Sequence, residues 1–289
     1  MVRPLNEDIK VFGIFGFPLS HTLSPLMHNQ ALRALQIPGI YFAFERNRNQ
    51  FLRLLRPRKK WILDGFNLTI PHKETILPYL DATDASAKLV GAVNTVKRVG
   101  NRWIGYNTDV YGFSKSLIEA SFKAKGKKAV ILGAGGGARA VLAALLKLGA
   151  KEIVIFNRTS SKSGRLVNEF QKKFRRSRIK NIQHRNDLRV EFQNTDLLVN
   201  ATSVGLKPGN TPPIPVSFLP RKKRMLVHDL IYGRRKTKLL QAAKRLGHRT
   251  ADGEAMLLYQ GARAFEIWTG KKAPLKTMRK ALHDGILAR

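Results

Sequence analysis

The stretch Ala129-Val130-Ile131-Leu132-Gly133-Ala134-Gly135-Gly136-Gly137-Ala138 decides the fold that we predict for this chain. Its apolar first part predicts a buried strand, its glycines predict a tight turn, and the apolar spacing over residues 140–148 predicts a helix. This order is typical of a dinucleotide site, because the glycines let a pyrophosphate approach the backbone and the helix N-terminus supplies amide donors. The sequence therefore predicts a Rossmann-type unit whose cofactor contacts are Gly133, Ala134, Gly135, Gly136 and Gly137.

The end of the following strand predicts which dinucleotide is bound. The strand from Glu152 to Phe156 leads into Asn157-Arg158-Thr159, and Lys162 follows. An enzyme that uses NAD usually carries Asp or Glu at this strand end for the ribose 2′-hydroxyl. A carboxylate there would repel a 2′-phosphate, whereas Arg and Lys pair with it. We therefore predict NADP as the cofactor.

A second informative stretch lies upstream, at Gly65-Phe66-Asn67-Leu68-Thr69-Ile70-Pro71-His72-Lys73. Its apolar residues predict a strand, which Pro71 ends because proline cannot donate to a sheet ladder. Lys73 would then follow a strand end, and Asn67 and Thr69, two residues apart, would share one face. Amide, hydroxyl and ammonium groups that face one space suit a small polyhydroxylated molecule. From these residues alone, an exposed lysine after an edge strand remains the alternative.

The residues before this stretch predict alternating strands and helices. Strands are expected at residues 11–16 and 41–44, and a helix is expected to begin with Ser24 as its N-cap and Pro25 as its first residue. This βαβαβ run implies a mostly parallel sheet. Thr22 and Ser24 would lie in the loop after the first strand, in the same kind of place as Lys73.

The residues after this stretch predict a hairpin and then a helix. Residues 92–96 and 102–105 flank the turn Val99-Gly100-Asn101, which is a hairpin signature. The hairpin would bring Asp109 to the start of a helix, and from this pattern alone Asp109 remains a simple N-cap.

The rest of the chain completes the predicted domain organisation. Residues 196–202 and 225–230 read as later strands of the Rossmann-type sheet, and residues 254–268 read as an apolar-faced helix that carries the polar Gln260. We predict an α/β protein with an N-terminal substrate-binding catalytic domain at 1–113 and a Rossmann NADP domain at 114–251. Residues 252–289 are predicted to form C-terminal helices that return to the first domain.

Composition narrows the class of protein. The chain has 289 residues, no cysteine and a formal net charge of +34. The lack of cysteine excludes disulfides, thiolate catalysis and Cys-ligated metals, and we expect no metal site. Lys and Arg are spread through every segment without interleaved aromatic residues or a known reader motif, so nonspecific polyanion binding is expected rather than specific nucleic-acid recognition. No apolar run is long enough to span a bilayer, and a cytoplasmic enzyme, monomeric or homodimeric, is expected.

Placed in order, these pieces resemble the shikimate dehydrogenase family from Val11 to about Leu282. The resemblance rests on residues 20–25, 67–73, 91–95, 105–109, the glycine loop, 157–159 and 259–262. It implies that Lys73 and Asp109 are the catalytic pair. It also implies substrate contacts at Thr22, Ser24, Asn67, Thr69, Asn94, Tyr232 and Gln260. The cofactor contacts that it implies are the glycine loop, Asn157, Arg158, Thr159, Lys162, Leu230 and Gly253.

The resemblance implies reversible reduction of 3-dehydroshikimate to shikimate with NADPH, in aromatic amino-acid biosynthesis. Two alternatives stay open: a quinate/shikimate dehydrogenase that also uses NAD, and a polyanion-binding or nucleic-acid-binding protein on a retired enzyme scaffold. The chain departs from the family pattern at Thr22, where Ser is common, and at Gly233-Arg234, where Asn-Pro is usual. Its net charge of +34 is also unusual for the family, and we interpret the chain as an engineered or surface-supercharged member.

Overall fold

The computed structural model describes residues 9–56, 61–206, 209 and 211–289. The chain forms two compact units, one of residues 1–108 with 260–289 and one of residues 109–259. The units therefore divide before Asp109 and before Gln260, whereas the sequence predicts borders after residues 113 and 251. Among the described residues, no helix is long and apolar enough to cross a membrane.

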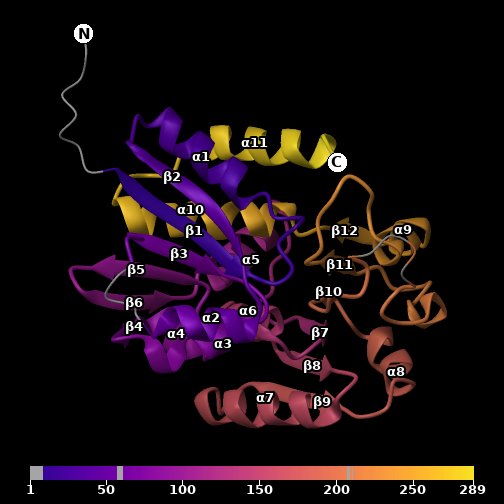
Figure 1. Ribbon diagram of the computed structural model, residues 1–289. Coiled ribbons are helices and arrows are strands. Elements are labelled where there is room, and N and C mark those ends of the chain that lie inside the picture. The colour runs from indigo at the N-terminus through magenta and orange to yellow at the C-terminus, as the bar shows by residue number, and fades with distance from the viewer. Residues whose placement is uncertain (1–8, 57–60, 207–208, 210) are drawn as a thin grey trace. The chain divides into compact units, whose positions relative to one another are not determined.

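The first unit is built on one mixed sheet with the strand order β2-β1-β3-β5-β6-β4 (Figure 1). Its strands are β1 Lys10–Gly16, β2 Gly39–Glu45, β3 Gly65–Leu68, β4 Ala82–Thr83, β5 Thr95–Val99 and β6 Arg102–Tyr106. Most neighbouring strands are parallel, as predicted, while β5 pairs antiparallel with both β3 and β6. The predicted hairpin is β5–β6, and its turn residue Gly100 has a φ of 57°, a backbone conformation that glycine adopts without strain.

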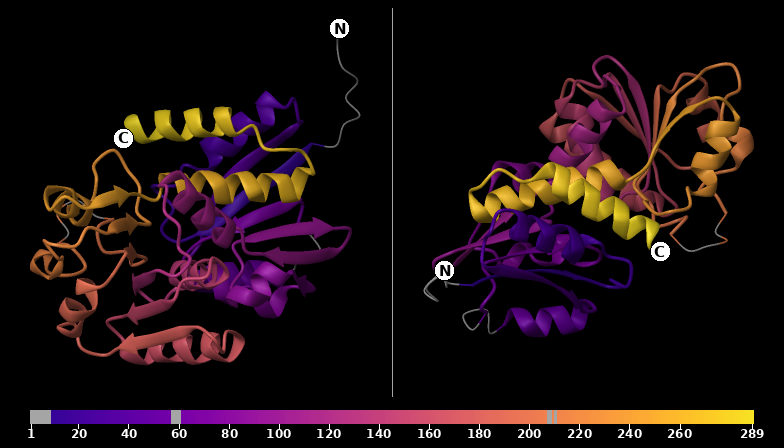
Figure 2. Two further views of the ribbon diagram at one scale, coloured as in Figure 1. Left: turned by 180° about the vertical axis from the view of Figure 1, so that it is seen from behind. Right: turned by 90° about the horizontal axis from the view of Figure 1, so that it is seen from above.

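Helices and an aromatic core cover this sheet. The helices are α1 Ser24–Ala34, α2 Arg48–Leu55, α3 His72–Thr75, the 3₁₀ turn η2 Leu77–Tyr79, α4 Ala85–Val90, the second part of α10 Glu254–Thr269, and α11 Leu275–Leu287. The C-terminal helix α11 packs beside α1, which agrees with a return of the chain's end to the first unit (Figure 2). Phe15, Phe66 and Trp103 lie in a buried cluster on the α2 side of the sheet.

Local details of the first unit correct two predictions. Ser24 is the first residue of α1 and not its N-cap, since Leu23 holds that position without a side-chain cap. Strand β3 ends at Leu68, so Thr69 lies just beyond the strand that was expected to continue to Ile70. Lys73 lies in the short helix α3 directly after this strand end. The His72 amide donates to the Thr69 carbonyl at 2.8 Å, which closes a turn over Ile70 and Pro71 before α3.

The second unit has an all-parallel sheet with the strand order β12-β11-β10-β7-β8-β9. Its strands are β7 Lys128–Leu132, β8 Glu152–Phe156, β9 Arg178–Ile182, β10 Leu197–Asn200, β11 Leu226–Asp229 and β12 Arg249–Ala251. Its helices are α5 Asp109–Glu119, α6 Gly136–Lys147, α7 Ser160–Lys173, α8 Asp187–Gln193, the 3₁₀ turn η3 Val216–Phe218 and α9 Lys238–Arg245. From β7 the chain proceeds first to one side of the sheet and then to the other. This places a topological switch point, the usual ligand site of such sheets, at the carboxyl ends of β7 and β10.

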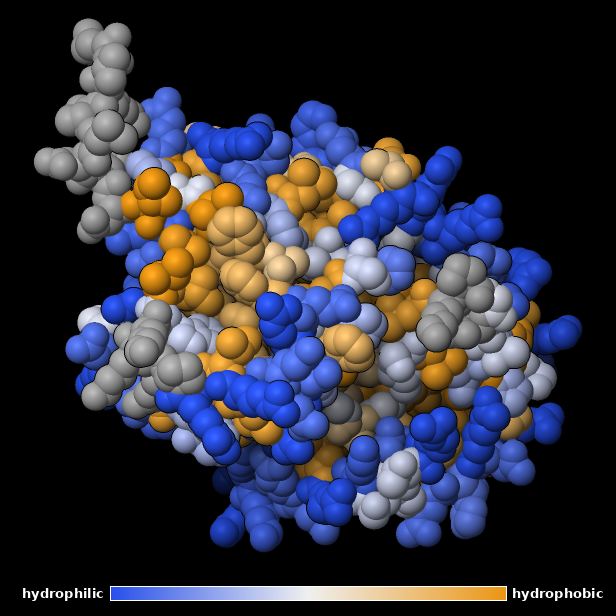
Figure 3. All heavy atoms as spheres, in the orientation of Figure 1, coloured by the Kyte–Doolittle hydropathy of each residue, from blue (hydrophilic) through white to orange (hydrophobic). Residues whose placement is uncertain are grey.

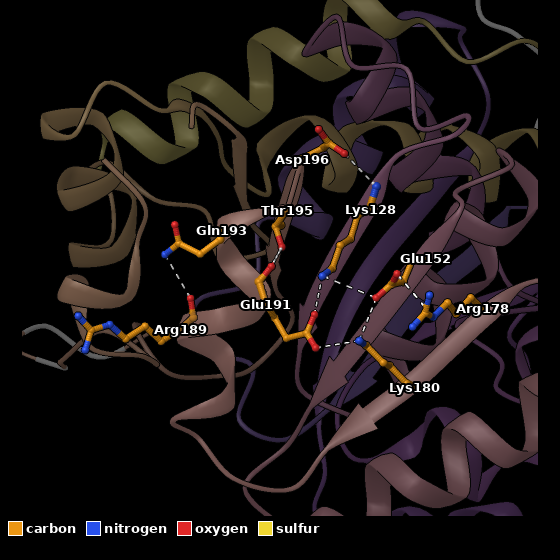
Figure 4. A network of polar contacts seen from close by, with 9 residues as sticks. All are labelled: Lys128, Glu152, Arg178, Lys180, Arg189, Glu191, Gln193, Thr195 and Asp196. Atoms are coloured by element: carbon orange, nitrogen blue, oxygen red, sulfur yellow. Dashed lines mark hydrogen bonds and ion pairs between the residues drawn. The ribbon is translucent and has the colours of Figure 1, made fainter. Parts of the chain in front are cut away.

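A charged cluster lies where strands of this sheet begin, and we define it as Lys128, Glu152, Lys180 and Glu191 (Figure 4). The Lys128 ammonium lies 2.5 Å from a Glu191 oxygen and 3.6 Å from a Glu152 oxygen. The Lys180 ammonium lies 2.8 Å from Glu191 and 3.0 Å from Glu152. The cluster thus ties β7, β8, β9 and α8 together by ion pairs. On the face drawn in Figure 3, hydrophilic side chains cover most of the surface, as the sequence suggests for scattered charge, and apolar side chains gather at the upper left.

Candidate active site

Lys73 is held by its neighbours in the first unit. The His72 ring is buried, lies 4.2 Å from the Phe51 ring centroid, and has its Nε2 2.8 Å from the Arg46 carbonyl. Burial lowers the pKa of His72, and the bond to the Arg46 carbonyl only partly opposes this shift, so the ring is neutral at pH 7. The Lys73 carbonyl also accepts a hydrogen bond of 2.8 Å from the Val93 amide. The backbone that carries the lysine is therefore fixed on both sides.

A line of neutral polar side chains, buried except for the half-buried Gln260, runs through the first unit, and we call it the polar row. It begins at the Tyr41 hydroxyl, which lies 2.8 Å from Asn67 Oδ1. Asn67 Nδ2 then lies 3.1 Å from the Asn94 carbonyl and 3.0 Å from Thr95 Oγ1. Its members are Tyr41, Asn67, Thr95, Asn94, Thr108 and Gln260.

The far end of the polar row reaches helix α10. Asn94 Nδ2 lies 2.9 Å from Thr108 Oγ1 and 3.3 Å from Gln260 Oε1. Asn94 Oδ1 accepts from the Thr108 amide at 2.8 Å and from the Thr95 hydroxyl at 3.1 Å. Three of the residues predicted to contact substrate, namely Asn67, Asn94 and Gln260, are thus brought into one hydrogen-bonded line.

Thr22 and Ser24 lie near the start of this row. Thr22 Oγ1 accepts a bond of 3.3 Å from the Ser24 amide, and Ser24 is buried. Burial raises the pKa of Tyr41 well above its usual value, although a hydrogen bond with the Ser24 side chain acts in the opposite direction. The guanidinium of Arg289 donates to the carbonyls of His21 and Thr22 at 2.6 and 3.0 Å, which ties this loop to the C-terminus.

The glycine loop of the second unit fits a dinucleotide. Gly133 has a φ of 112°, and a Cβ there would lie 3.0 Å from the Ala201 carbonyl oxygen at the end of β10. Gly135 precedes helix α6 in extended conformation, and a Cβ there would meet nothing within 4 Å. Open space therefore adjoins the N-terminus of a long helix, where amide donors and the helix dipole favour a pyrophosphate.

The residues predicted to choose between NADP and NAD follow β8. Asn157 Nδ2 donates to the Thr159 carbonyl at 2.9 Å, which bends the chain into α7. Arg158 and Thr159 are exposed, and Lys162 is exposed in the first turn of α7. No carboxylate ends β8, so the position suits the 2′-phosphate of NADP better than the free 2′-hydroxyl of NAD.

Gly253 lies against the backbone of Leu230 after β11, and Tyr232 follows in the loop that Leu230 begins. A Cβ on Gly253 would lie 2.0 Å from the Leu230 carbonyl oxygen, so only glycine fits there. Asp229 organises the loop that carries Tyr232, because its carboxylate accepts from Thr237 Oγ1 at 2.8 Å, Asn200 Nδ2 at 2.9 Å and the Ile231 amide at 3.1 Å. Burial raises the pKa of Asp229 to about 6, although these bonds oppose the shift.

Asp109 is the first residue of α5, and the second unit begins with it. This helix is anchored to β11 within the second unit. His228 Nε2 lies 3.0 Å from Ser116 Oγ, and the His228 ring centroid lies 5.2 Å from that of Phe113. Burial lowers the pKa of His228 to about 4, so the ring is neutral at pH 7. Among the described residues, no three His, Asp or Glu side chains gather as metal ligands.

Sequence reasoning missed several residues of these arrangements. Thr95 and Thr108 lie inside the stretches that carry the family resemblance, so they could have been found there. Tyr41 could not, because an aromatic residue in a predicted buried strand carries no signal beyond core packing. Asp229 follows a predicted strand, but its partners Asn200 and Thr237 become visible only in the fold.

Family models match most of the chain. Residues 14–96 match the shikimate dehydrogenase substrate binding domain, residues 116–207 match shikimate / quinate 5-dehydrogenase, and residues 253–283 match the shikimate 5′-dehydrogenase C-terminal domain.

Individual proteins are similar over nearly their whole length. A shikimate dehydrogenase (NADP(+)) of Carboxydothermus hydrogenoformans is 41% identical over 96% of this chain and 98% of its own, and one of Methanopyrus kandleri is 40% identical over 98% of each. A shikimate dehydrogenase solved in complex with NADP+ is 38% identical with a TM-score of 0.86, covering 98% of this chain and 99% of its own. A quinate dehydrogenase from Corynebacterium glutamicum, solved with NAD, is 29% identical with a TM-score of 0.86, covering 96% of this chain and 99% of its own.

Proposed function

The chain belongs to the shikimate dehydrogenase family, and from this premise we propose which of its residues carry out the reaction. The activity is NADP-dependent shikimate dehydrogenase: reversible reduction of 3-dehydroshikimate to shikimate, a step of aromatic amino-acid biosynthesis. Lys73 and Asp109 are the proposed catalytic residues. Thr22, Ser24, Asn67, Thr69, Asn94, Tyr232 and Gln260 are the proposed substrate contacts.

The chemistry needs a proton donor beside the substrate oxygen. NADPH, when bound, supplies the hydride. As the ketone accepts it, negative charge develops on the oxygen, and the Lys73 ammonium would stabilise and protonate that oxygen. Asp109 would hold the ammonium in position and accept a bond from a neighbouring substrate hydroxyl. The neutral amides and hydroxyls of the polar row suit the remaining hydroxyls of the substrate, because each can be matched by a directional hydrogen bond.

The observation that carries the cofactor assignment is the end of β8, where Asn157 and Arg158 stand in place of an acidic residue. The glycine loop supports the same site, since Gly135 adjoins open space at the start of α6, and Gly253 allows the close approach of the Leu230 backbone.

The direct test is the reduction of NADP+ by the purified protein in the presence of shikimate, followed by absorbance. We expect turnover with shikimate and NADP+ and much weaker turnover with NAD+. Similarity to a quinate dehydrogenase makes quinate with NAD+ the informative comparison. Strong quinate oxidation with NAD+ would contradict the assignment. A protein that binds a polyanion but lacks turnover with either substrate would favour the retired-scaffold alternative.

Three expectations stay proposals: a cytoplasmic location, a monomer or homodimer, and nonspecific polyanion binding by the surface that gives the chain its net charge of +34. The interpretation of that charge as engineered has no support in the fold or in the relatives. A steep loss of polyanion binding with added salt would show that only backbone phosphates are bound.

A further inference from the structure

The polar row has one donor-to-acceptor direction, and backbone groups decide it. A carbonyl can only accept and an amide N–H can only donate, whereas a side-chain amide can turn either end to a neighbour. Asn67 lies 3.1 Å from the Asn94 carbonyl, so its nitrogen must face that carbonyl. Asn67 Oδ1 therefore faces Tyr41, and the Tyr41 hydroxyl must be the donor in their bond of 2.8 Å.

The same reasoning fixes the next members. The Thr108 amide donates at 2.8 Å to Asn94 Oδ1, so Asn94 Nδ2 faces Gln260 Oε1. Thr95 Oγ1 receives a hydrogen from Asn67 Nδ2 at 3.0 Å and donates its own to Asn94 Oδ1 at 3.1 Å. The direction thus runs from Tyr41 through Asn67, Thr95 and Asn94 to Gln260.

Asn67 has only a hydrogen-bond acceptor left to offer a substrate. Both of its N–H groups are used, by the Asn94 carbonyl and by Thr95 Oγ1. Its oxygen receives one hydrogen from Tyr41 and keeps a second acceptor site. Toward a substrate, Asn67 can therefore only accept a hydrogen bond.

Tyr41 is rigidly placed for this task. Its backbone amide and carbonyl are both bonded by the Asn29 side chain, at 2.8 and 3.0 Å. Its ring stacks on His28, with centroids 4.5 Å apart and planes 10° apart, and it is only 1% exposed. Burial lowers the pKa of His28 to about 3, so this neighbour stays uncharged.

We propose that Tyr41 is a positioning residue for the substrate: its hydroxyl holds the Asn67 amide in the one orientation that accepts a hydrogen bond from a substrate hydroxyl. Thr95 serves the same purpose on the other side of Asn67. This inference rests on the proposed function. It implies that the site favours a substrate with a hydroxyl group beside Asn67 over one with an oxygen that cannot donate a hydrogen bond there.

The test is Tyr41→Phe, which removes the hydroxyl and keeps the stacked ring. We expect the KM for shikimate to rise about threefold to tenfold, as for loss of one neutral hydrogen bond, with the KM for NADP+ within about twofold. Tyr79→Phe is the matched control in the same unit, because it removes a hydroxyl outside the polar row, and it should leave both KM values unchanged. If Tyr41 had only a structural role, Tyr41→Phe would lower the melting temperature and would not selectively raise the KM for shikimate.

A double-mutant cycle that combines Tyr41→Phe with Asn67→Ala tests whether Tyr41 acts on the substrate through Asn67. If Tyr41 acts through Asn67, then Tyr41→Phe should change the KM for shikimate less than about twofold once Asn67 is alanine. An unchanged KM in Tyr41→Phe alone, or the same increase in both backgrounds, would overturn the proposal. If the unmodified protein does not oxidise shikimate, the proposed function fails and this inference fails with it. Activity in the unmodified protein with no effect of Tyr41→Phe refutes the inference alone.

Discussion

The polar row of the first unit is mostly buried and the charged cluster of the second is half-buried, and the two networks use opposite chemistry. The polar row consists of neutral amides and hydroxyls joined by bonds of mostly 2.8 to 3.3 Å, each with a defined donor and acceptor. The charged cluster pairs Lys128 and Lys180 with Glu152 and Glu191, and each ammonium contacts both carboxylates. An ammonium is close to a point charge and imposes little direction, whereas an amide must present the correct end.

The difference in chemistry suits two different tasks, orientation of binding groups in the polar row and stabilisation of the fold in the charged cluster. Groups that recognise a substrate need a fixed orientation, and neutral directional bonds provide it without a large desolvation cost. Groups that only hold strands and a helix together can use ion pairs. In the charged cluster, burial alone raises the pKa of Glu152, but the bonds to Lys180 and the charges of Lys128 and Arg178 outweigh it, so the pKa is lowered. The pKa of Glu191 is lowered in the same way by Lys128 and Lys180. Variants in the first region should therefore change kinetics, and variants in the second should change stability.

The largest effect is expected at Lys73. Lys73→Ala should lower kcat about 100-fold to 10 000-fold, since it removes the proposed proton donor, and should leave the melting temperature nearly unchanged. Steady-state assays with shikimate and NADP+ give the first quantity and thermal unfolding gives the second. Lys128→Ala is the counterpart in the charged cluster and should do the reverse. Equal losses of turnover in the two variants would erase the distinction between the regions.

Acid should destabilise the protein before the charged cluster titrates. His28 and His228 have pKa values lowered to about 3 and about 4 by burial, so between about pH 7 and about pH 5 the unfolded chain binds protons that the folded chain does not. Stability is therefore lost as the pH falls, by roughly 2 kcal/mol for His28 alone over this range. Asp229 acts in the opposite direction, because its folded pKa of about 6 lies above its unfolded value.

Urea unfolding at about pH 7 and about pH 5 measures this loss in the free energy of unfolding. Glu191→Gln should show the same loss over this range, because the carboxylates of the charged cluster titrate at lower pH, where their depressed pKa values add a further loss. A stability that rises on acidification would contradict the neutral state of the buried histidines.

The third prediction concerns Arg158 and the binding of NADP+ by the second unit. Arg158→Ala should raise the KM for NADP+ about 10-fold to 100-fold, because a charge-assisted bond to the 2′-phosphate is lost, with little change in the KM for shikimate or for NAD+. Arg175→Ala, which removes an exposed cation from the same unit, is the control for the general effect of charge. A matching increase for both variants would mean that the KM reports only the overall positive field.

The smallest effect is expected in the charged cluster itself. Glu191→Gln should lower the free energy of unfolding by about 1–2 kcal/mol, because Lys128 and Lys180 then share only Glu152, while kcat and KM stay unchanged. Asp284→Asn breaks the exposed pair with Lys280 and should cost at most about 0.5 kcal/mol. Urea titrations of both variants at low and high salt compare them. A kinetic defect in Glu191→Gln would show that the charged cluster also serves the reaction.

Much of the fold could be predicted because its signals are local. The glycine loop between β7 and α6, the β5–β6 hairpin and the alternation of strands and helices each depend on a few adjacent residues whose backbone preferences are strong. No element is predicted between residues 160 and 193, although Leu166, Val167 and Phe170 of α7 have helical spacing. The start of α1 was misjudged at Ser24 because serine is also acceptable inside a first helical turn. The cofactor residues of the glycine loop and of the β8 end follow from such local patterns, whereas the pairing of Lys73 with Asp109 came from the family resemblance.

The sequence by itself determined the strand–glycine loop–helix order, the absence of an acid after β8 and hence the preference for NADP. These follow from what adjacent residues can do sterically and electrostatically. Only the tertiary structure decided that Tyr41 meets Asn67 across 26 residues of chain and that Asn94 meets Gln260 across 166. The direction of a hydrogen bond depends on which carbonyl or amide lies opposite a side chain. Strand order and the return of α10 set that arrangement, and no local pattern encodes it.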